Sequence, residues 1–180
     1  HICVFSIQKL MKSRKNLIFL GMMGSGKSSI GLIVSKKLGI DFLDVDHEIE
    51  KKLGMSVSKI FLTKGEDYFR EIEEITTLKI LKKNKTVISL GGGSFLNNKI
   101  RKNILENHIS FWLNWDIKTL INRIENSQKR PIAFNSSKNE LTELIKKRSF
   151  VYSKAMYKID CDNLSKSEIA KFVLEIYGTC

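Results

Sequence analysis

The sequence predicts a three-layer α/β/α fold in which helices cover both faces of a central, mainly parallel sheet. Short apolar runs alternate along the chain with longer segments whose apolar residues recur at helical spacing. This alternation is typical of βαβ units, in which each helix leads the chain back to the next parallel strand. With 180 residues, 42% of them hydrophobic, the chain can bury the core of one such domain.

The first elements are marked by apolar runs and by glycines. Residues 16–20 are an apolar run that ends at a glycine, as expected of a buried parallel strand. Residues 27–38 have helical apolar spacing and are followed by Gly39, a common helix stop. A second short strand is predicted at 41–45, and Asp46 is expected to cap the helix that follows it.

The remaining elements follow from the same criteria of apolar period and run length. The predicted helices span residues 56–62, 66–82, 117–124, 140–152 and 165–177. The predicted strands span residues 86–90, 110–113 and 157–160. The polar segment 126–138 is predicted to be a loop, and because it is rich in Ser and Asn we expect a mobile lid at about 127–140.

Composition limits the classes of partner. The net charge of +12 raises nucleic acid as an alternative. We expect solvated helix faces instead, because the lysines are scattered and basic charge alone is a weak signal. No apolar run reaches the roughly 18–20 residues that span a bilayer, so no membrane partner is expected. Three cysteines without paired spacing fit a cytoplasmic protein, and we expect a monomer.

The N-terminal segment is expected to lie outside the domain. The chain starts at His1, whereas Met11 stands just before the first strand signal. We therefore interpret residues 1–15 as an N-terminal extension that is disordered, read through from upstream or a remnant, and residues 16–180 as a single domain.

A phosphate-binding loop is the most specific local motif. Residues 21–28 match G-x-x-x-x-G-K-S, between a predicted strand and a predicted helix. Glycines let successive N–H groups face phosphate oxygens at a helix N-terminus. Lys27 would reach the β- and γ-phosphates of ATP, and the Ser28 hydroxyl would ligate Mg²⁺. The alternative is a chance glycine-rich turn. The motif predicts a P-loop NTPase-type fold whose nucleotide contacts are Gly24, Ser25, Gly26, Lys27, Ser28 and Ser29.

Two further patterns stand at predicted strand ends, where open α/β sheets bind ligands. Asp44 and Asp46 would share a face if the second strand continues through them. One could hold Mg²⁺ through water while the other accepts a proton. The alternative is a helix cap plus a turn residue. The triple glycine of residues 91–93 exposes backbone N–H groups to a ligand, unless it is only a flexible loop.

Arginine is scarce, since only six of the 31 basic residues are Arg. In a chain that mostly uses Lys, we expect each Arg to be present for its planar guanidinium, which can bind a ligand through two hydrogen bonds. Four of the six (Arg70, Arg123, Arg130 and Arg148) belong to a larger pattern. The phosphate loop is followed by Gly31, then L-D-V-D, F-R-E-I-E-E, G-G-G, R-P, and an Arg with Tyr four residues on. In this order the motifs resemble the shikimate kinase family over nearly the whole chain.

The resemblance implies ATP-dependent, Mg²⁺-assisted phosphorylation of the shikimate 3-hydroxyl, a step of aromatic amino-acid (chorismate) biosynthesis. It implies that Asp46 binds substrate hydroxyls and acts as the base, that Asp44 supports the Mg²⁺ site with Ser28, and that Lys27 and Arg130 act on the phosphates. Arg130 would close over them from the lid, and Arg123 would pack near adenine.

The resemblance also implies that Arg70 and Arg148 hold the shikimate carboxylate beside Gly91, Gly92 and Gly93, and that Glu73 orients a substrate hydroxyl or Arg70. The chain departs from the family in having Phe150 where Pro is usual and Ile132 where the lid usually has Leu. A kinase for another polyol acid, such as gluconate, and a kinase-like binding domain without catalysis are the alternatives. The arginine pair with the triple glycine counts against the first, and the intact functional positions count against the second.

Overall fold

The computed structural model describes residues 15–126 and 137–178. Its centre is a five-stranded sheet in the order β2-β3-β1-β4-β5, and every pairing between these strands is parallel. The strands are β1 (Leu17–Leu20), β2 (Asp41–Asp44), β3 (Thr86–Ser89), β4 (Ile109–Asn114) and β5 (Tyr157–Asp160). The predicted α/β fold with a parallel sheet is confirmed.

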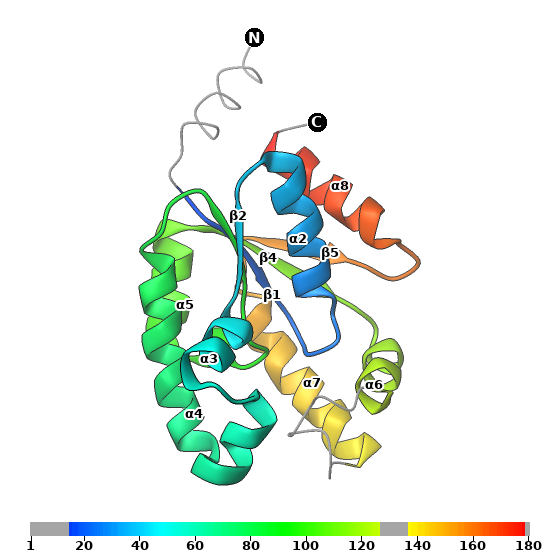
Figure 1. The fold of residues 1–180 in the computed structure, drawn as a ribbon. Coiled ribbons are helices and arrows are strands. Elements are labelled where there is room, and N and C mark those ends of the chain that lie inside the picture. Colours follow the sequence, from blue (N-terminus) through cyan, green and yellow to red (C-terminus); the bar gives the residue numbers. More distant parts are fainter. Residues whose placement is uncertain (1–14, 127–136, 179–180) are drawn as a thin grey trace.

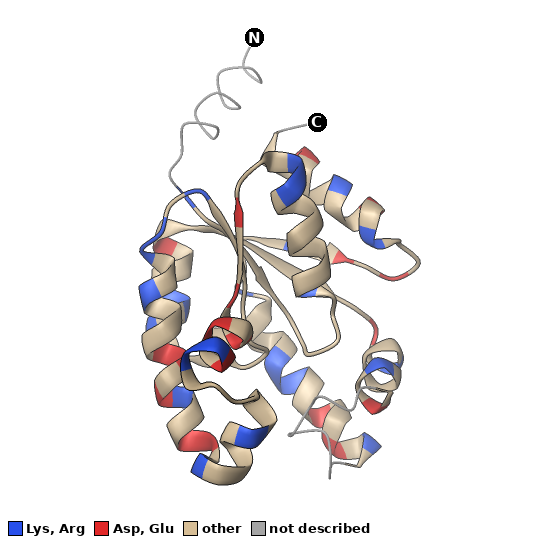
Figure 2. Cartoon of the chain, in the orientation of Figure 1, with Lys and Arg blue, Asp and Glu red and all other residues tan. Residues whose placement is uncertain are grey.

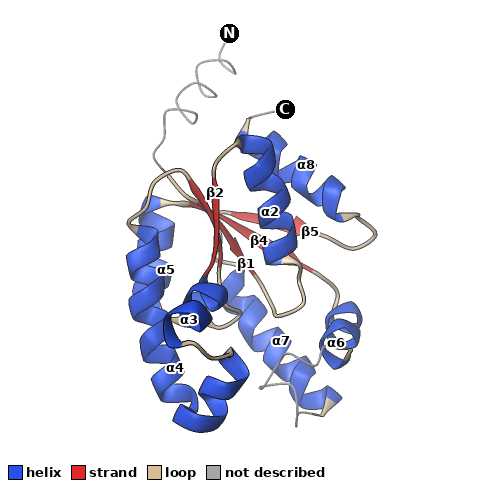
Figure 3. Ribbon diagram, in the orientation of Figure 1, coloured by secondary structure: helices blue, strands red, loops and turns tan. Residues whose placement is uncertain are grey.

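Helices lie on both sides of this sheet (Figure 1). The helices are α2 (Lys27–Leu38), α3 (Val45–Leu53), α4 (Val57–Leu81), α5 (Asn98–Asn107), α6 (Ile117–Glu125), α7 (Lys138–Tyr152) and α8 (Lys166–Tyr177), with a short 3₁₀ helix η1 (Ser94–Leu96). Helices α2 and α8 pack together on one side, and α4 and α5 pack together on the other (Figure 3). None of these helices is long and apolar enough to cross a membrane.

The core lies where the two helix layers meet the sheet. All four residues of β1 and all four of β3 are buried, as expected of central parallel strands. Gly31 lets α2 approach β2 closely, because a Cβ atom there would lie 2.8 Å from the Phe42 ring. Parallel strands bring their carboxyl ends to one edge of the sheet, so the segments after β1, β2 and β3 meet there.

The structure corrects the prediction for Asp46. Strand β2 ends at Asp44, and it is the Asp44 carboxylate that caps α3, accepting a hydrogen bond from the His47 N–H. Asp46 therefore lies in the first turn of α3 and does not extend the strand. A carboxylate must precede the first free N–H groups to cap them, and Asp44 holds that position.

Two other differences concern helices. The helix α5 was not predicted, because Ile100 and Ile104 are its only buried residues and the rest of its sequence is polar except for the exposed Leu105. The two helices predicted on either side of residue 65 form one element, α4, but Gly65 interrupts it with non-helical angles (φ 84°, ψ 170°). The predicted break is therefore present as a kink.

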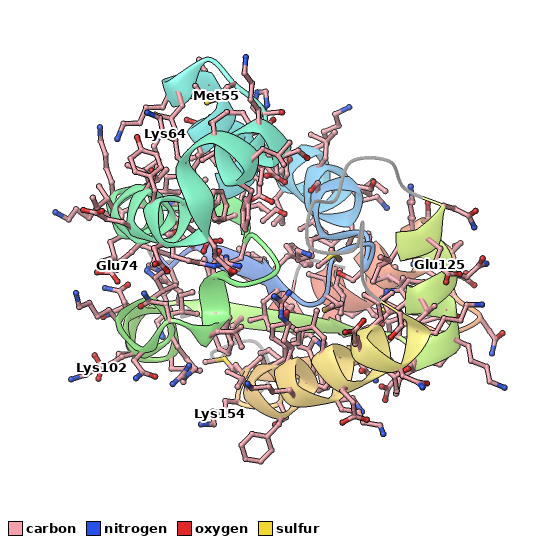
Figure 4. All side chains as sticks on the ribbon, turned by 90° about the horizontal axis from the view of Figure 1, so that it is seen from below. Met55, Lys64, Glu74, Lys102, Glu125 and Lys154 are labelled. Carbon is pink, nitrogen blue, oxygen red and sulfur yellow. The ribbon has the colours of Figure 1, made fainter. Side chains whose placement is uncertain are left out.

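Lysine and arginine are distributed over helices of both layers (Figure 2). Figure 4 looks from below onto the edge where the strands end, and its labelled side chains, among them Lys64, Lys102 and Lys154, lie at the periphery of that view. The expected extension 1–15 falls, except for Lys15, outside the described residues, as does most of the expected lid.

Candidate active site

A cleft of about 770 Å³ opens at the carboxyl ends of the strands. Its walls come from the phosphate loop, the end of β2, helix α4, the triple glycine, Arg123 before the undescribed segment and Arg148 of α7. One continuous cleft therefore brings together segments that are far apart in the sequence.

The phosphate loop enters α2 through glycines with left-handed angles. Gly24 and Gly26 have φ values of 82° and 88°, which glycine adopts without strain. The Lys27 ammonium donates to the carbonyl oxygens of Gly21 and Met22, at 3.0 and 2.9 Å. These contacts hold the ammonium group against the loop, at the N-terminus of a 12-residue helix.

Ser28 and Asp44 form a pair of oxygen ligands beside this loop. The Ser28 hydroxyl donates to Oδ2 of Asp44 at 2.5 Å and lies 3.3 Å from the Ser89 hydroxyl at the end of β3. The described residues contain no group of three or more His, Cys, Asp and Glu side chains that could hold a metal by themselves. A hydroxyl and a carboxylate are nevertheless hard ligands of the kind that suit Mg²⁺ when phosphate and water complete its shell.

Asp46 is the most perturbed carboxyl group of the cleft. Its Oδ1 atom is shut off from solvent and has no hydrogen-bond partner among the described residues. Burial, followed by repulsion from Asp44 and Glu73, raises the pKa of Asp46 to about 7, against a smaller opposing effect of Lys27. A carboxyl group with this pKa can exchange a proton near neutral pH.

Glu73 is fixed by protein groups on both of its oxygens. Arg70 Nη1 donates to Oε2 at 2.7 Å, and the Ser94 hydroxyl donates to Oε1 at 2.6 Å. Gly91 lies directly over this carboxylate, since a Cβ atom at Gly91 would lie 2.6 Å from Glu73 Oε1 and 2.7 Å from Asp46 Oδ1. Glu73 therefore contacts Arg70, one of the two partners expected for it. The close approach to Glu73 and Asp46 explains why residue 91 is glycine although it does not line the cleft.

Arg70 and Arg148 approach the triple glycine from two helices. Arg70 lies against Gly93, where a Cβ atom would collide with its guanidinium, and it packs over the Phe61 and Phe69 rings. Arg148 is only 5% exposed, and its Nη1 lies 3.5 Å from the Gly92 carbonyl oxygen. Two cations therefore converge beside bare backbone, an arrangement that suits a carboxylate ligand.

Arg148 and Tyr152 share that carbonyl. The Tyr152 hydroxyl donates to the Gly92 oxygen, and burial raises the pKa of Tyr152 to about 12. Nε of Arg148 is buried and has no partner among the described residues. A buried guanidinium with an unused donor is prepared for an anion.

At the other end of the cleft, Arg123 stacks on Trp115, with its Cζ atom 3.7 Å from the centre of the indole. Arg123 Nη1 donates to the Gly24 carbonyl at 3.3 Å, and Trp115 Nε1 donates to the Ser25 carbonyl at 2.9 Å. Lys166 also lines the cleft there, with its Nζ 3.4 Å from the Ser29 hydroxyl.

Most residues singled out from the sequence line this cleft. These are Gly24, Ser25, Gly26, Lys27, Ser28, Ser29, Asp44, Asp46, Arg70, Glu73, Gly92, Gly93, Arg123 and Arg148. Arg130 lies outside the described residues. Ser89, Trp115 and Lys166 also line the cleft but were not singled out, because no motif marks them.

Comparison with known proteins gives consistent matches. The family model described as shikimate kinase matches residues 23–177. A shikimate kinase of Bacillus subtilis (strain 168) is 41% identical over 169 residues, which cover 89% of this chain and 88% of that protein. A solved structure of shikimate kinase from Acinetobacter baumannii in complex with shikimate superposes with a TM-score of 0.87 at 26% identity, covering 94% of this chain and 96% of that one.

A more distant likeness concerns the alternative of a kinase that acts on gluconate. A gluconokinase from Sinorhizobium meliloti 1021 superposes with a TM-score of 0.57 at 16% identity, covering 92% of each chain. At this level of identity the likeness shows a shared fold and no more.

Proposed function

The chain belongs to the shikimate kinase family, and we propose that its cleft transfers the γ-phosphoryl group of ATP to the 3-hydroxyl of shikimate. The observation that carries this proposal is the position of Asp46 within the cleft. Its perturbed carboxyl lies between a phosphate-binding loop on one side and a pair of arginines on the other. A phosphate donor and a carboxylated acceptor can therefore meet at one proton acceptor.

The nucleotide would bind at the loop of residues 21–28. Its N–H groups and the N-terminus of α2 favour phosphate oxygens, and Lys27 would exchange its bonds to the loop carbonyls for bonds to the β- and γ-phosphates. Ser28 and Asp44 would hold Mg²⁺ together with phosphate oxygens and water. When bound, this ion would neutralise charge on the transferred group.

The acceptor would bind at the opposite end. Its carboxylate would pair with Arg70 and Arg148, whose guanidinium groups converge on Gly92 and Gly93. Glu73 would keep Arg70 oriented through the 2.7 Å bond to Nη1. The acceptor hydroxyl would then face Asp46.

In the transfer step, the hydroxyl oxygen of shikimate forms a bond to the γ-phosphorus, and the bond from that phosphorus to the bridging oxygen of ADP breaks. The hydroxyl proton passes to Asp46, whose pKa near 7 suits an acceptor working at neutral pH. Lys27 and Arg130 would stabilise charge on the transferred group, and Arg123 would contact the adenine end.

The family match supports shikimate over gluconate as the acceptor, and the two arginines beside bare backbone would receive its carboxylate. Small-molecule turnover requires neither nucleic acid nor a membrane, and we propose a cytoplasmic monomer.

Coupled assays of ADP release test the proposal. Turnover should require shikimate and Mg²⁺ and should be absent with gluconate. Asp46→Asn should lower kcat by at least about 10²-fold while ADP still binds, since general-base catalysis contributes about that much. ADP release with gluconate but not with shikimate would overturn the assignment.

A further inference from the structure

Two neighbouring carbonyl groups of the phosphate loop accept hydrogen bonds from side chains outside the loop. Arg123 donates a hydrogen bond to the carbonyl oxygen of Gly24, and Trp115 donates one to the carbonyl oxygen of Ser25. The oxygen and the N–H of a peptide unit point in opposite directions, so these donors also fix the direction of the N–H groups that the loop offers to a phosphate.

The Ser25–Gly26 peptide can reverse its orientation easily. A peptide flip changes ψ of the preceding residue and φ of the following one, and Gly26, at φ 88°, has no Cβ atom to resist the change. The flip would turn the Ser25 oxygen toward the phosphate oxygens and remove the Gly26 N–H from them. Among the described residues, the hydrogen bond from Trp115 Nε1 is what opposes this flip from outside the loop.

The position of Trp115 suits it to hold this peptide. It follows β4 directly, is only 8% exposed, and reaches the loop across 90 positions of sequence. Its indole does two things at once: the edge donates to the Ser25 oxygen, and the face carries the Arg123 guanidinium at 3.7 Å. Arg123 in turn donates to the Gly24 oxygen. Two neighbouring carbonyls of the loop thus depend on one aromatic side chain.

We propose that Trp115 is a positioning residue for the nucleotide. It holds the Ser25–Gly26 peptide in the orientation that binds phosphate, and it fixes Arg123 at the end of the cleft where the adenine would lie. The inference rests on the proposed function, because it concerns the nucleotide half of the same cleft. It adds a residue that contacts neither the phosphates nor the acceptor and acts through the loop backbone.

The test separates the indole N–H from the ring. Trp115→Phe keeps an aromatic face for Arg123 but removes the donor, whereas Trp115→Leu removes both. We expect Trp115→Phe to raise the Kd of ADP and the KM of ATP by about 3- to 10-fold, the usual range for one lost hydrogen bond, and Trp115→Leu to raise them further. The KM of shikimate should stay within about twofold, since Arg70 and Arg148 lie at the other end of the cleft.

The matched control is Trp112→Phe. Trp112 lies on β4, three residues before Trp115, and is 7% exposed, but no hydrogen bond joins its indole to the loop among the described residues. The Trp112→Phe variant should leave the Kd of ADP unchanged. This variant also leaves Trp115 as the protein's single tryptophan. Saturating ADP should change its fluorescence emission, and shikimate alone should not.

These measurements distinguish the possible failures. If the wild-type protein does not bind ADP, the proposed function is wrong. If the wild type binds ADP and Trp115→Phe binds it equally well, only the role of Trp115 is wrong. If Trp115→Phe does not fold, the emission of the Trp112→Phe protein decides: a signal that ADP does not change overturns the inference, and an ADP-specific change supports it.

Discussion

Glu66 and Arg70 form a two-point ion pair, in which Oε1 of Glu66 accepts from both Nε and Nη2 of Arg70, at 3.2 and 3.0 Å. Glu66 directly follows the kink at Gly65, and Arg70 lies one helical turn later. With Glu73 on Nη1, both edges of this guanidinium already hold carboxylates. A substrate carboxylate that uses Arg70 must therefore compete with the more exposed of the two, Glu66, whose side chain is 58% exposed.

Glu66→Gln should lower the KM of shikimate by about 1.5- to 5-fold, the range expected when one exposed ion pair is removed from competition. The KM of ATP should not change. Glu143→Gln is the control, because it removes an exposed ion pair with Lys146 on α7, away from the cleft. A higher KM of shikimate in Glu66→Gln would show that Glu66 supports the guanidinium and does not compete for it.

Lys27→Ala should abolish measurable turnover and weaken ATP binding, because it removes the charge placed against the β- and γ-phosphates. It also removes two hydrogen bonds to loop carbonyls, so the thermal midpoint of unfolding must be measured in parallel. Lys166→Ala, at the far end of the cleft, serves as a comparison and should retain turnover. A near wild-type rate in Lys27→Ala would exclude the phosphate-loop assignment.

The raised pKa of Asp46 predicts a pH-dependent stability in the absence of nucleotide and divalent metal. Its pKa is about 7 in the folded protein and 3.8 by reference, so between these values the folded state holds a proton that the unfolded state has released. This contribution is complete below about pH 4 and is lost as the pH rises through about 7. Ionised Asp46 is therefore destabilising at pH 8.

Asp46→Asn removes that penalty. Its thermal midpoint, relative to the wild type, should be higher at pH 8 than at pH 5, with each kcal/mol shifting the midpoint by about 2–4 °C in a domain of this size. Glu48→Gln is the control in the same helix turn and should show no such trend. A difference between Asp46→Asn and the wild type that does not vary with pH would mean that Asp46 is ionised throughout.

The parts of the fold and cleft that depend on local sequence pattern could be predicted from the sequence. The phosphate loop, the kink at Gly65 and the buried strands have signals within a few residues, namely glycine positions and apolar runs. Helix α5 has no such signal, because it faces the core through only Ile100 and Ile104. Its start at the Asn97 cap, which accepts from two N–H groups, could have been recognised as a capping residue.

The parts that could not be predicted depend on contacts between distant segments. No sequence motif marks Trp115, and only the folded chain brings its N–H to a carbonyl of the phosphate loop. The pKa of Asp46 likewise depends on Asp44, Glu73 and burial together. Asp46 was expected to cap the following helix, whereas Asp44 does so, because β2 ends at Asp44 and α3 begins at the next residue.

The sharpest prediction concerns the fork geometry of Arg70 and Arg148. If each makes charge-assisted bonds to the substrate carboxylate, each contributes on the order of 1.5–3 kcal/mol, which corresponds to a rise of roughly 10- to 100-fold in the KM of shikimate when it is lost. Arg→Lys should be almost as damaging as Arg→Ala, because an ammonium cannot reproduce the planar fork. The KM of ATP should barely change, which separates this effect from a general loss of structure.

A substrate analogue provides the complementary test. Replacing the carboxylate of shikimate with a neutral amide should make a poor substrate for the wild type, and the double variant Arg70→Lys, Arg148→Lys should discriminate much less between the two. Arg148 is the more buried of the pair, with its Nε buried and unpartnered among the described residues, so its replacement should also cost stability. Arg101→Lys, whose side chain bonds to carbonyls outside the cleft, is the matched control and should keep the wild-type KM. Wild-type KM values in both cleft variants, or equal phosphorylation of the amide, would contradict the assignment, because neither outcome is compatible with a carboxylate held between these two guanidinium groups.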